Sequence, residues 1–322
     1  MRTLLGLTLA AALASGPPAP LGLDLYRPTP ADNPLTPAGI ALGRRIFQDR
    51  RFSRDGTLSC AVCHDPSRAF ANSREVAPGP GGTTGRRNVP TLINRAYGES
   101  FFWDGRAESI EQQVLQPLLN PAEMAMTPYA VVATARGDRR YVRQFLAAYG
   151  REPRLDDVAR ALASYVRTIR SGNSPYDRFR SGVKGALTER EQRGMRLFFG
   201  KGRCGSCHAG ANLTDERFHN TGVSFRDGRP LDPGRFVVTR NPAELGAFKT
   251  PTLREIARTA PYMHDGSQST LEDVVEYYDR GGNANAGLDT ILRPIGLSLE
   301  DKRALAAFLR ALSGDVQEGR RW

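Results

Sequence analysis

Two stretches of the chain, 60-CAVCH-64 and 204-CGSCH-208, share one pattern. They contain all four cysteines of the 322-residue sequence and two of its four histidines. Two thiols separated by two residues can form thioethers with the vinyl groups of one haem, and the adjacent histidine then faces the iron as proximal ligand. The pattern therefore predicts two covalently bound c-type haems. The attachment and ligand residues are Cys60, Cys63 and His64 for the first haem, and Cys204, Cys207 and His208 for the second.

Two other uses of the cysteines compete with the haem interpretation. A four-thiolate zinc site would use all four thiols, and two disulfides would suit an oxidising compartment. Both leave His64 and His208 without a role. We favour two haems, because only they use all six residues of the two motifs.

A repeat extends outward from the two motifs. The strip 88-NVPTLINRAYGESFFWDGR-106 returns as 249-KTPTLREIARTAPYMHDGS-267 at an offset of 161, with Trp103 in one copy and His264 in the other. Amphipathic stretches that begin at Thr36 and Thr188, two potential helix N-caps, precede the motifs. Apolar residues at helical spacing close each copy, and Ser298 with Asp301 forms a potential capping pair. The closing helices carry Val158, Leu162, Tyr165, Val166 and Ile169 in one copy, and Leu305, Phe308, Leu309 and Leu312 in the other.

This order of segments predicts an all-α fold, because no sustained period-two alternation indicates a sheet. We expect two cytochrome c-like domains related by internal duplication, each with one covalently bound haem. The N-terminal domain would span residues 15–172 and the C-terminal domain residues 173–322. The Gly, Asn, Ser and Pro residues of 171–179 favour a linker between them.

The N-terminus predicts export. Residues 1–14 contain Arg2, an apolar run and an Ala-Leu-Ala site, which is typical of a cleavable signal peptide, although a buried N-terminal helix is the alternative. We therefore expect a periplasmic protein. No later segment approaches 18 uninterrupted apolar residues, so we do not expect it to span a membrane.

The chain carries a net charge of +11. Export argues against nucleic acid as the partner. The basic residues are scattered and interleaved with acids, so two explanations stay open: a solvated surface, or docking to an acidic protein partner or to acidic groups of a cofactor.

The repeat register also distinguishes the two haems. At the offset of 161, Ile110 pairs with Leu271 and Pro117 with Tyr278. Proline cannot bind iron, whereas a tyrosine can, so the register predicts an open first haem and a tyrosine-ligated second haem. Tyr277 is the rival ligand, but helical spacing turns two adjacent side chains about 100° apart, so that only one should reach the iron.

Both motifs, together with 101-FFWDGRAESIEQQVLQPLLNPAEMAM-126 and 248-FKTPTLREIARTAPYMHDGSQSTLEDVVEYYDRGG-282, resemble the bacterial di-haem cytochrome c peroxidase family, and within it the MauG branch. The resemblance implies that Trp103 lies between the haems as an electron relay. It implies that Gln113, Pro117 and Glu123 line a peroxide pocket, with Glu123 moving the proton. It further implies Tyr278 as ligand of the second haem, where the peroxidases proper usually have Met. By the same resemblance, one calcium ion would be bound by the Asn88 side chain and the Thr259 and Pro261 carbonyls.

The resemblance implies an enzyme that reduces hydrogen peroxide at the first haem and takes electrons through the second from a protein donor. That donor would be a small c-type cytochrome, a cupredoxin or a protein substrate. Peroxidases of the family usually carry a blocking His after the first motif, but no His lies between His64 and His208, so we expect an open first haem in the oxidised protein. A di-haem electron-transfer cytochrome without peroxidase activity is the alternative. Monomer and homodimer both stay open, and we expect structural roles for His219 and His264.

Overall fold

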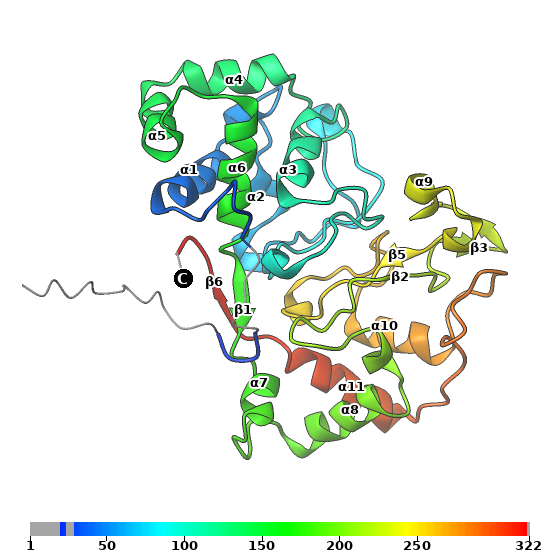
Figure 1. Ribbon diagram of the computed structural model, residues 1–322. Helices are drawn as coiled ribbons and strands as arrows, with labels where there is room; N and C mark the ends of the chain where they lie inside the picture. Colours follow the sequence, from blue (N-terminus) through cyan, green and yellow to red (C-terminus); the bar gives the residue numbers. More distant parts are fainter. Residues whose placement is uncertain (1–19, 24–28, 321–322) are drawn as a thin grey trace, which may run out of the picture.

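The computed structural model describes residues 20–23 and 29–320 (Figure 1). The predicted signal peptide, residues 1–14, lies outside the described residues. Helices dominate the described part, and its strands form antiparallel pairs of only two or three residues per strand. The expectation of a helical fold is confirmed at this level. Within the described residues, no helix has both the length and the apolar character needed to cross a membrane.

The elements follow in chain order. The first part contains α1 (Pro37–Gln48), α2 (Cys60–Cys63), α3 (Ile110–Leu119), α4 (Pro128–Arg136), α5 (Arg139–Tyr149) and α6 (Leu155–Val166). The second contains α7 (Pro175–Arg180), α8 (Glu189–Phe199), α9 (Phe236–Thr239), α10 (Leu271–Asp279) and α11 (Leu299–Arg310). The strand pairs are β1 (Arg170–Gly172) with β6 (Asp315–Gln317), β2 (Phe218–His219) with β5 (Phe248–Lys249), and β3 (Phe225–Arg226) with β4 (Arg229–Pro230).

Side-chain caps fix where the helices begin. The Thr36 hydroxyl accepts from the N–H of Gly39 at the start of α1, and Thr188 forms a capping box with Glu191 at the start of α8. Ser298 and Asp301 form the same reciprocal pair at the start of α11. Each cap satisfies N–H groups that lack partners within the helix. The three predicted helix starts are therefore confirmed.

Two helix pairs organise the structure, α1 against α6 and α8 against α11. In each pair a glycine brings the two backbones together. A Cβ at Gly43 would lie 1.8 Å from the carbonyl oxygen of Ala161, and a Cβ at Gly194 would lie 2.0 Å from that of Ala304. No side chain fits in either space, so the sequence must have glycine at both crossings.

A separate apolar cluster surrounds each helix pair. The first draws its buried residues from 42–169 and the second from 176–312. The apolar faces predicted for the closing helices are buried in these clusters (Val158, Leu162, Tyr165, Val166 and Ile169; Leu305, Phe308, Leu309 and Leu312). The two clusters are compatible with two duplicated domains, and a boundary at 172/173 stays a prediction.

The segment 171–179, expected to be a linker, has regular structure. It contains the end of β1, which pairs with β6, and most of α7, whose first turn is closed by a capping box between Ser174 and Asp177. Asp177 also forms a buried ion pair of 2.5 Å with Arg254. The turn-forming residues that suggested a linker thus make the sharp change from strand to helix.

The helix crossings give a test of stability. Gly43→Ala and Gly194→Ala should each lower the free energy of unfolding by about 1–3 kcal/mol, because the added methyl group forces two backbones apart. Chemical unfolding of the haem-loaded protein, followed by circular dichroism, measures the change. Gly137→Ala is the control: Gly137 has φ −69° and a Cβ there would lie 3.2 Å from its nearest neighbour, so the change should stay below about 1 kcal/mol. Equal losses in all three variants would contradict the close approach.

Candidate haem and peroxide site

One cavity of about 860 Å³ reaches from the first C-x-x-C-H motif to the second. Its wall includes all six motif residues (Cys60, Cys63, His64, Cys204, Cys207 and His208). Most of the remaining wall is apolar, supplied by both core clusters. Two large, flat and mainly apolar groups fit such a space, and the donor atoms that would hold them lie along its wall.

The chain holds both motif histidines in the same way. Nδ1 of His64 lies 3.0 Å from the carbonyl oxygen of Phe70, and Nδ1 of His208 lies 3.1 Å from that of Leu213. Burial lowers the pKa of His64 to about 4 and also lowers the pKa of His208, so both rings are neutral at pH 7. With the proton on Nδ1, the lone pair on Nε2 of each ring could bind iron.

The repeated Pro-Thr-Leu strip supports these histidines. The backbone carbonyl of Pro90 opposes part of the burial effect on the pKa of His64, and the backbone carbonyl of Pro251 does the same for His208. The next residue in each copy, a threonine, uses its hydroxyl to bind the loop that follows the motif. The two hydroxyl bonds run from Thr91 to the Ala69 carbonyl at 2.5 Å and from Thr252 to the Asn212 carbonyl at 2.6 Å. The two copies of the strip thus make equivalent contacts with the loops that follow the two motifs.

The two alternative uses of the cysteines find no support. All four thiols are free, so the motifs do not form disulfides. Within the part of the chain that the structure describes, the four sulfurs do not come together as a tetrathiolate site. Burial raises the pKa of Cys60 to about 12 and of Cys204 to about 11, which leaves unmodified thiols protonated. The residues fit thioether attachment, which removes the titratable proton.

The three predicted peroxide-pocket residues all line this cavity, and Glu123 lies near enough to Cys63 of the first motif to affect the pKa of its thiol. Gln113 and Pro117 stand one helical turn apart on α3, so their side chains lie on one face. Glu123 follows in the turn after α3, where its carboxylate accepts a 2.8 Å hydrogen bond from the Asn120 amide. Burial raises the pKa of Glu123, while the Asn120 bond and the charge of Arg106 act against that rise.

The two tyrosines of α10 point to different surroundings. The Tyr277 hydroxyl donates to the Thr221 carbonyl at 2.9 Å and accepts from the N–H of Asn283 at 3.2 Å. Tyr278 lines the cavity instead. Burial raises the pKa of the Tyr278 phenol above its usual value. A Tyr278 phenolate would therefore need a cation beside it.

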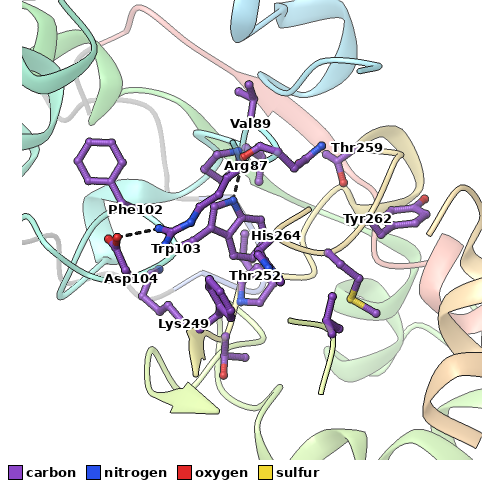
Figure 2. Close-up of a pocket in the computed structure, with 18 of the residues that line it drawn as sticks. Arg87, Val89, Phe102, Trp103, Asp104, Lys249, Thr252, Thr259, Tyr262 and His264 are labelled. Carbon is purple, nitrogen blue, oxygen red and sulfur yellow. Dashed lines mark hydrogen bonds and ion pairs between the residues drawn. The ribbon is translucent and has the colours of Figure 1, made fainter. Parts of the chain in front are cut away.

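Trp103 lies where the two parts of the chain meet (Figure 2). Its indole Nε1 donates to the Asn88 carbonyl at 2.9 Å, and its own carbonyl accepts from the N–H of Lys249 at 2.8 Å. The His264 carbonyl accepts from the N–H of Asn88 at 2.7 Å. The strips 88–106 and 249–267 thus meet at Trp103 and His264, and main-chain bonds join them.

A second layer of contacts surrounds this junction. The His264 ring stacks on Phe248, with centroids 3.7 Å apart, and burial lowers the pKa of His264 to about 4. The Arg87 guanidinium lies 5.3 Å from the Phe248 ring and forms 2.7 Å ion pairs with both Asp104 and Asp232. Sequence reasoning missed Arg87, Phe248 and Asp232, because no spacing rule brings their three segments together.

A cluster of buried charged side chains lies beside the junction between the strips 88–106 and 249–267. The Glu216 carboxylate bonds to Arg95 at 2.9 Å and to Lys249 at 3.2 Å, and all three side chains are at most 9% exposed. Both cations lower the pKa of Glu216 against the effect of burial, whereas burial lowers the pKa of Lys249 to about 8. Arg95 lies in one strip and Lys249 in the other, so Glu216 ties them together.

The residues expected to bind calcium also line the cavity, namely Asn88, Thr259 and Pro261. The Asn88 amide donates to the carbonyls of Arg74 at 3.1 Å and Glu75 at 3.3 Å. Its side-chain oxygen is thereby left as the atom that could face a cation, which suits the preference of Ca²⁺ for oxygen. A calcium ion here stays a prediction.

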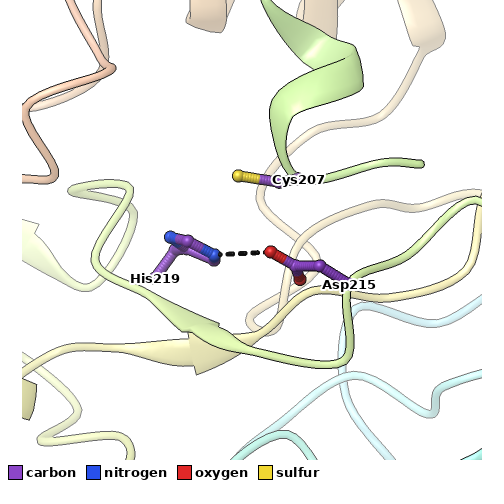
Figure 3. Close-up of side chains that lie close together, drawn as sticks. All are labelled: Cys207, Asp215 and His219. Atoms are coloured by element: carbon purple, nitrogen blue, oxygen red, sulfur yellow. Dashed lines mark hydrogen bonds and ion pairs between the residues drawn. The ribbon is translucent and has the colours of Figure 1, made fainter.

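His219 lies beside Cys207 of the second motif and is paired with Asp215 (Figure 3). Its Nδ1 is 2.6 Å from Asp289 and its Nε2 is 3.0 Å from Asp215. Cys207, Asp215 and His219 place potential metal-binding atoms within 4.8 Å of one another. However, a haem thioether would occupy the Cys207 sulfur, and both ring nitrogens already face carboxylates. The arrangement fits an imidazolium paired with two acids, in agreement with the expected structural role.

Comparison with known proteins places these features in a family. Residues 37–185 match the family described as di-haem cytochrome c peroxidase. The methylamine utilization protein MauG of Methylorubrum extorquens is 39% identical over 290 residues, which cover 89% of this chain and 82% of that protein. The chain belongs to the di-haem cytochrome c peroxidase family.

Other members of the di-haem cytochrome c peroxidase family align over similar lengths. The cytochrome c551 peroxidase of Pseudomonas aeruginosa is 33% identical, and the match covers 90% of this chain and 84% of that protein. The crystal structure of a MauG-like protein associated with microbial copper homeostasis superposes with a TM-score of 0.85 at 35% identity, covering 91% of this chain and 95% of that one. The protein is therefore a di-haem oxidoreductase with two haem c groups as its cofactors.

The pairing of His219 predicts a pH-dependent stability. Cys207, then Asp289 and Asp215, raise the pKa of His219 from 6.5 to about 10, and thioether formation removes the first of these contributions. A raised pKa stabilises the fold fully below 6.5, and this contribution is lost as the pH rises through the folded-state value. In the haem-loaded protein that loss should fall between pH 6.5 and 10.

His219→Gln should remove this dependence. Thermal unfolding midpoints of the wild type and the variant should differ most near pH 6 and converge toward pH 10. A difference that stays constant over this range would show that His219 contributes no charge-dependent stability.

Proposed function

We propose that the protein is a periplasmic enzyme that reduces hydrogen peroxide in the part of the cavity next to His64. Electrons would enter from a protein donor through the part next to His208. The observation that carries this proposal is the placement of Glu123, a partly buried carboxyl group of raised pKa, on the same cavity wall as Gln113, Pro117 and the first C-x-x-C-H motif. An electron carrier needs no proton-transfer group at that position.

Haem attached at Cys60 and Cys63 and bound by His64 would supply one-electron redox chemistry and a coordination position for peroxide. Cleavage of the O–O bond consumes two electrons and two protons and releases two waters. We propose that a Glu123 carboxylate oxygen takes the proton from the inner peroxide oxygen and returns it to the outer one. The Gln113 amide would orient peroxide or water. Pro117 offers no group that could compete for the iron.

Trp103 is the proposed electron relay. It lies on the cavity wall between the motifs, and bonds from both strips hold its indole and its carbonyl. A large aromatic ring fixed at this place shortens each step of a transfer between the two haem positions. His264 occupies the equivalent place in the second strip, but its stacking on Phe248 and its lowered pKa favour a structural role.

Tyr278 is the proposed second ligand of the haem held by Cys204, Cys207 and His208. It lines the cavity, whereas Tyr277 uses its hydroxyl in two hydrogen bonds elsewhere. The iron would provide the positive charge that a buried phenolate needs. A tyrosine here agrees with the likeness to MauG, and calcium at Asn88, Thr259 and Pro261 is part of the same proposal.

The donor is proposed as a small c-type cytochrome, a cupredoxin or a protein substrate. The relative named cytochrome c551 peroxidase supports a c-type cytochrome as the donor. The net charge of +11 favours a donor with an acidic surface. Steady-state oxidation of reduced cytochrome or cupredoxin by peroxide distinguishes these classes.

Glu123 gives the direct test of the proposed function. The haem-loaded wild type should react with hydrogen peroxide in stopped-flow experiments, and Glu123→Gln should slow this reaction by about 10²–10⁴-fold, because the amide cannot accept the proton. Haem content and the unfolding midpoint should not change. A wild type that gives no reaction with peroxide would leave the electron-transfer cytochrome as the function.

The two tyrosines of α10 offer a matched pair of variants. Tyr278→Phe should change the optical and electron paramagnetic resonance spectra of the second haem, because the ring loses its only ligand atom. Tyr277→Phe should leave those spectra unchanged and lower the free energy of unfolding by about 1 kcal/mol through loss of its hydrogen bonds. Unchanged spectra in Tyr278→Phe would exclude this tyrosine as the ligand.

A further inference from the structure

The tetrapeptide Asn-Pro-Ala-Glu occurs twice in the chain, at 120–123 and 241–244. Its offset of 121 does not match the repeat offset of 161, so the two copies are not equivalent positions of the duplication. Both form the same turn. The Asn side-chain oxygen accepts from the Ala N–H at 3.0 Å in the first copy and 3.1 Å in the second, and the Glu N–H donates to the Asn carbonyl at 3.0 Å in both.

The two copies differ in what the glutamate side chain contacts. Glu123 accepts a 2.8 Å bond from the Asn120 amide and lines the cavity. Glu244 instead accepts from the hydroxyl of Thr239. The turn therefore forms equally well without a bond between the Asn amide and the Glu carboxylate. At 120–123 the turn therefore does not require the bond between the Asn120 amide and the Glu123 carboxylate. This bond is specific to the copy that lines the cavity.

We propose that Asn120 is the positioning residue for Glu123, whose carboxylate its side-chain amide holds in place on the cavity wall. This inference rests on the proposed role of Glu123 in peroxide reduction. The amide bond is the one side-chain hydrogen bond given to Glu123 by the described part of the chain. The backbone of Asn120 contributes as well, since its carbonyl accepts from the N–H groups of Glu123 at 3.0 Å and Ala125 at 2.9 Å.

Among the residues that the structure describes, no other group near Glu123 holds its carboxylate in place by a hydrogen bond. Arg106 acts on Glu123 through its charge, but its guanidinium is occupied by 3.0 Å bonds to Asp104 and stacks 3.5 Å above the Phe102 ring. Cys63 of α2 lies near the carboxylate, and it is uncharged both as a thiol, whose pKa burial raises to about 11, and as a thioether. Neither residue directs the carboxylate by a hydrogen bond.

Asn120→Asp tests the proposal with little change in shape. The Asp side chain can still accept from the N–H of Ala122, so the turn persists, but an oxygen replaces the amide donor and places a second carboxylate beside Glu123. A like charge raises the pKa of its neighbour. The acidic limb of the pH profile for the reaction with peroxide should therefore move up by about one pH unit, and the rate below that limb should fall about tenfold.

Asn241→Asp is the matched control. It makes the same substitution in the same tetrapeptide, at a residue whose amide does not contact the glutamate, so the pH profile should not move. Haem content and circular dichroism report whether each variant folds. If Asn120→Asp does not incorporate haem, Asn120→Ser keeps a side-chain oxygen for the turn and lacks the amide. Its acidic limb should also move upward.

Infrared difference spectra separate this inference from the proposed function. The C=O stretch of protonated Glu123, identified by its loss in Glu123→Gln, can be titrated without any turnover. In Asn120→Asp or Asn120→Ser this band should persist to higher pH than in the wild type and in Asn241→Asp. Failure of the wild type to react with peroxide would overturn only the proposed function. Identical titrations in all variants would overturn the role of Asn120.

Discussion

Two close contacts between helix backbones, α1 on α6 and α8 on α11, determine where the other segments of this protein lie. At Gly43 and Gly194 the helix surface has no side chain, so each helix lies directly on the carbonyl of an alanine in its partner. Such an approach fixes both the distance and the crossing point of the pair, because a well-packed interior tolerates little displacement. In each part of the chain, the segment that carries the C-x-x-C-H motif follows the first helix of the pair.

The two halves of the chain have similar backbone arrangements, but different side chains line the cavity in each half. In both strips the threonine after the proline uses its hydroxyl to hold the loop that follows the C-x-x-C-H motif. The register that makes the strips alike also places Pro117 against Tyr278 and Trp103 against His264. Similar backbone arrangements in the two halves thus carry different side chains at equivalent positions. One half places a carboxyl group of raised pKa, that of Glu123, in the cavity, and the other places the phenol of Tyr278 there. The two halves therefore differ in the side chains that they place in the cavity, although their helix pairs are alike.

The sequence alone predicted the features that follow from local spacing. The two motifs, the three helix caps and the apolar faces of the closing helices depend on residues close in the chain, and the structure bears out the caps and buried faces. The sequence did not predict contacts between distant segments, such as Arg87 with Asp232 or Phe248 on His264, since the fold alone brings these residues together. The regular structure of 171–179, which was expected to be a linker, was not predicted, because Gly, Asn, Ser and Pro form tight turns as readily as flexible chain.

The pairing of β1 with β6 bears on the order of folding. Arg170 and Gln317 are 147 residues apart in sequence, yet their backbones are partners in one ladder, and Glu318 bonds to Arg44 and to Tyr165 of the first core. The first half of the chain therefore lacks part of its native surroundings until residues 315–318 have been synthesised. Contacts between residues so far apart in the sequence slow folding, because the long loop between them must close first. They also couple the folding of the two segments that they connect. We infer that the two halves complete their folding together, as a single cooperative unit.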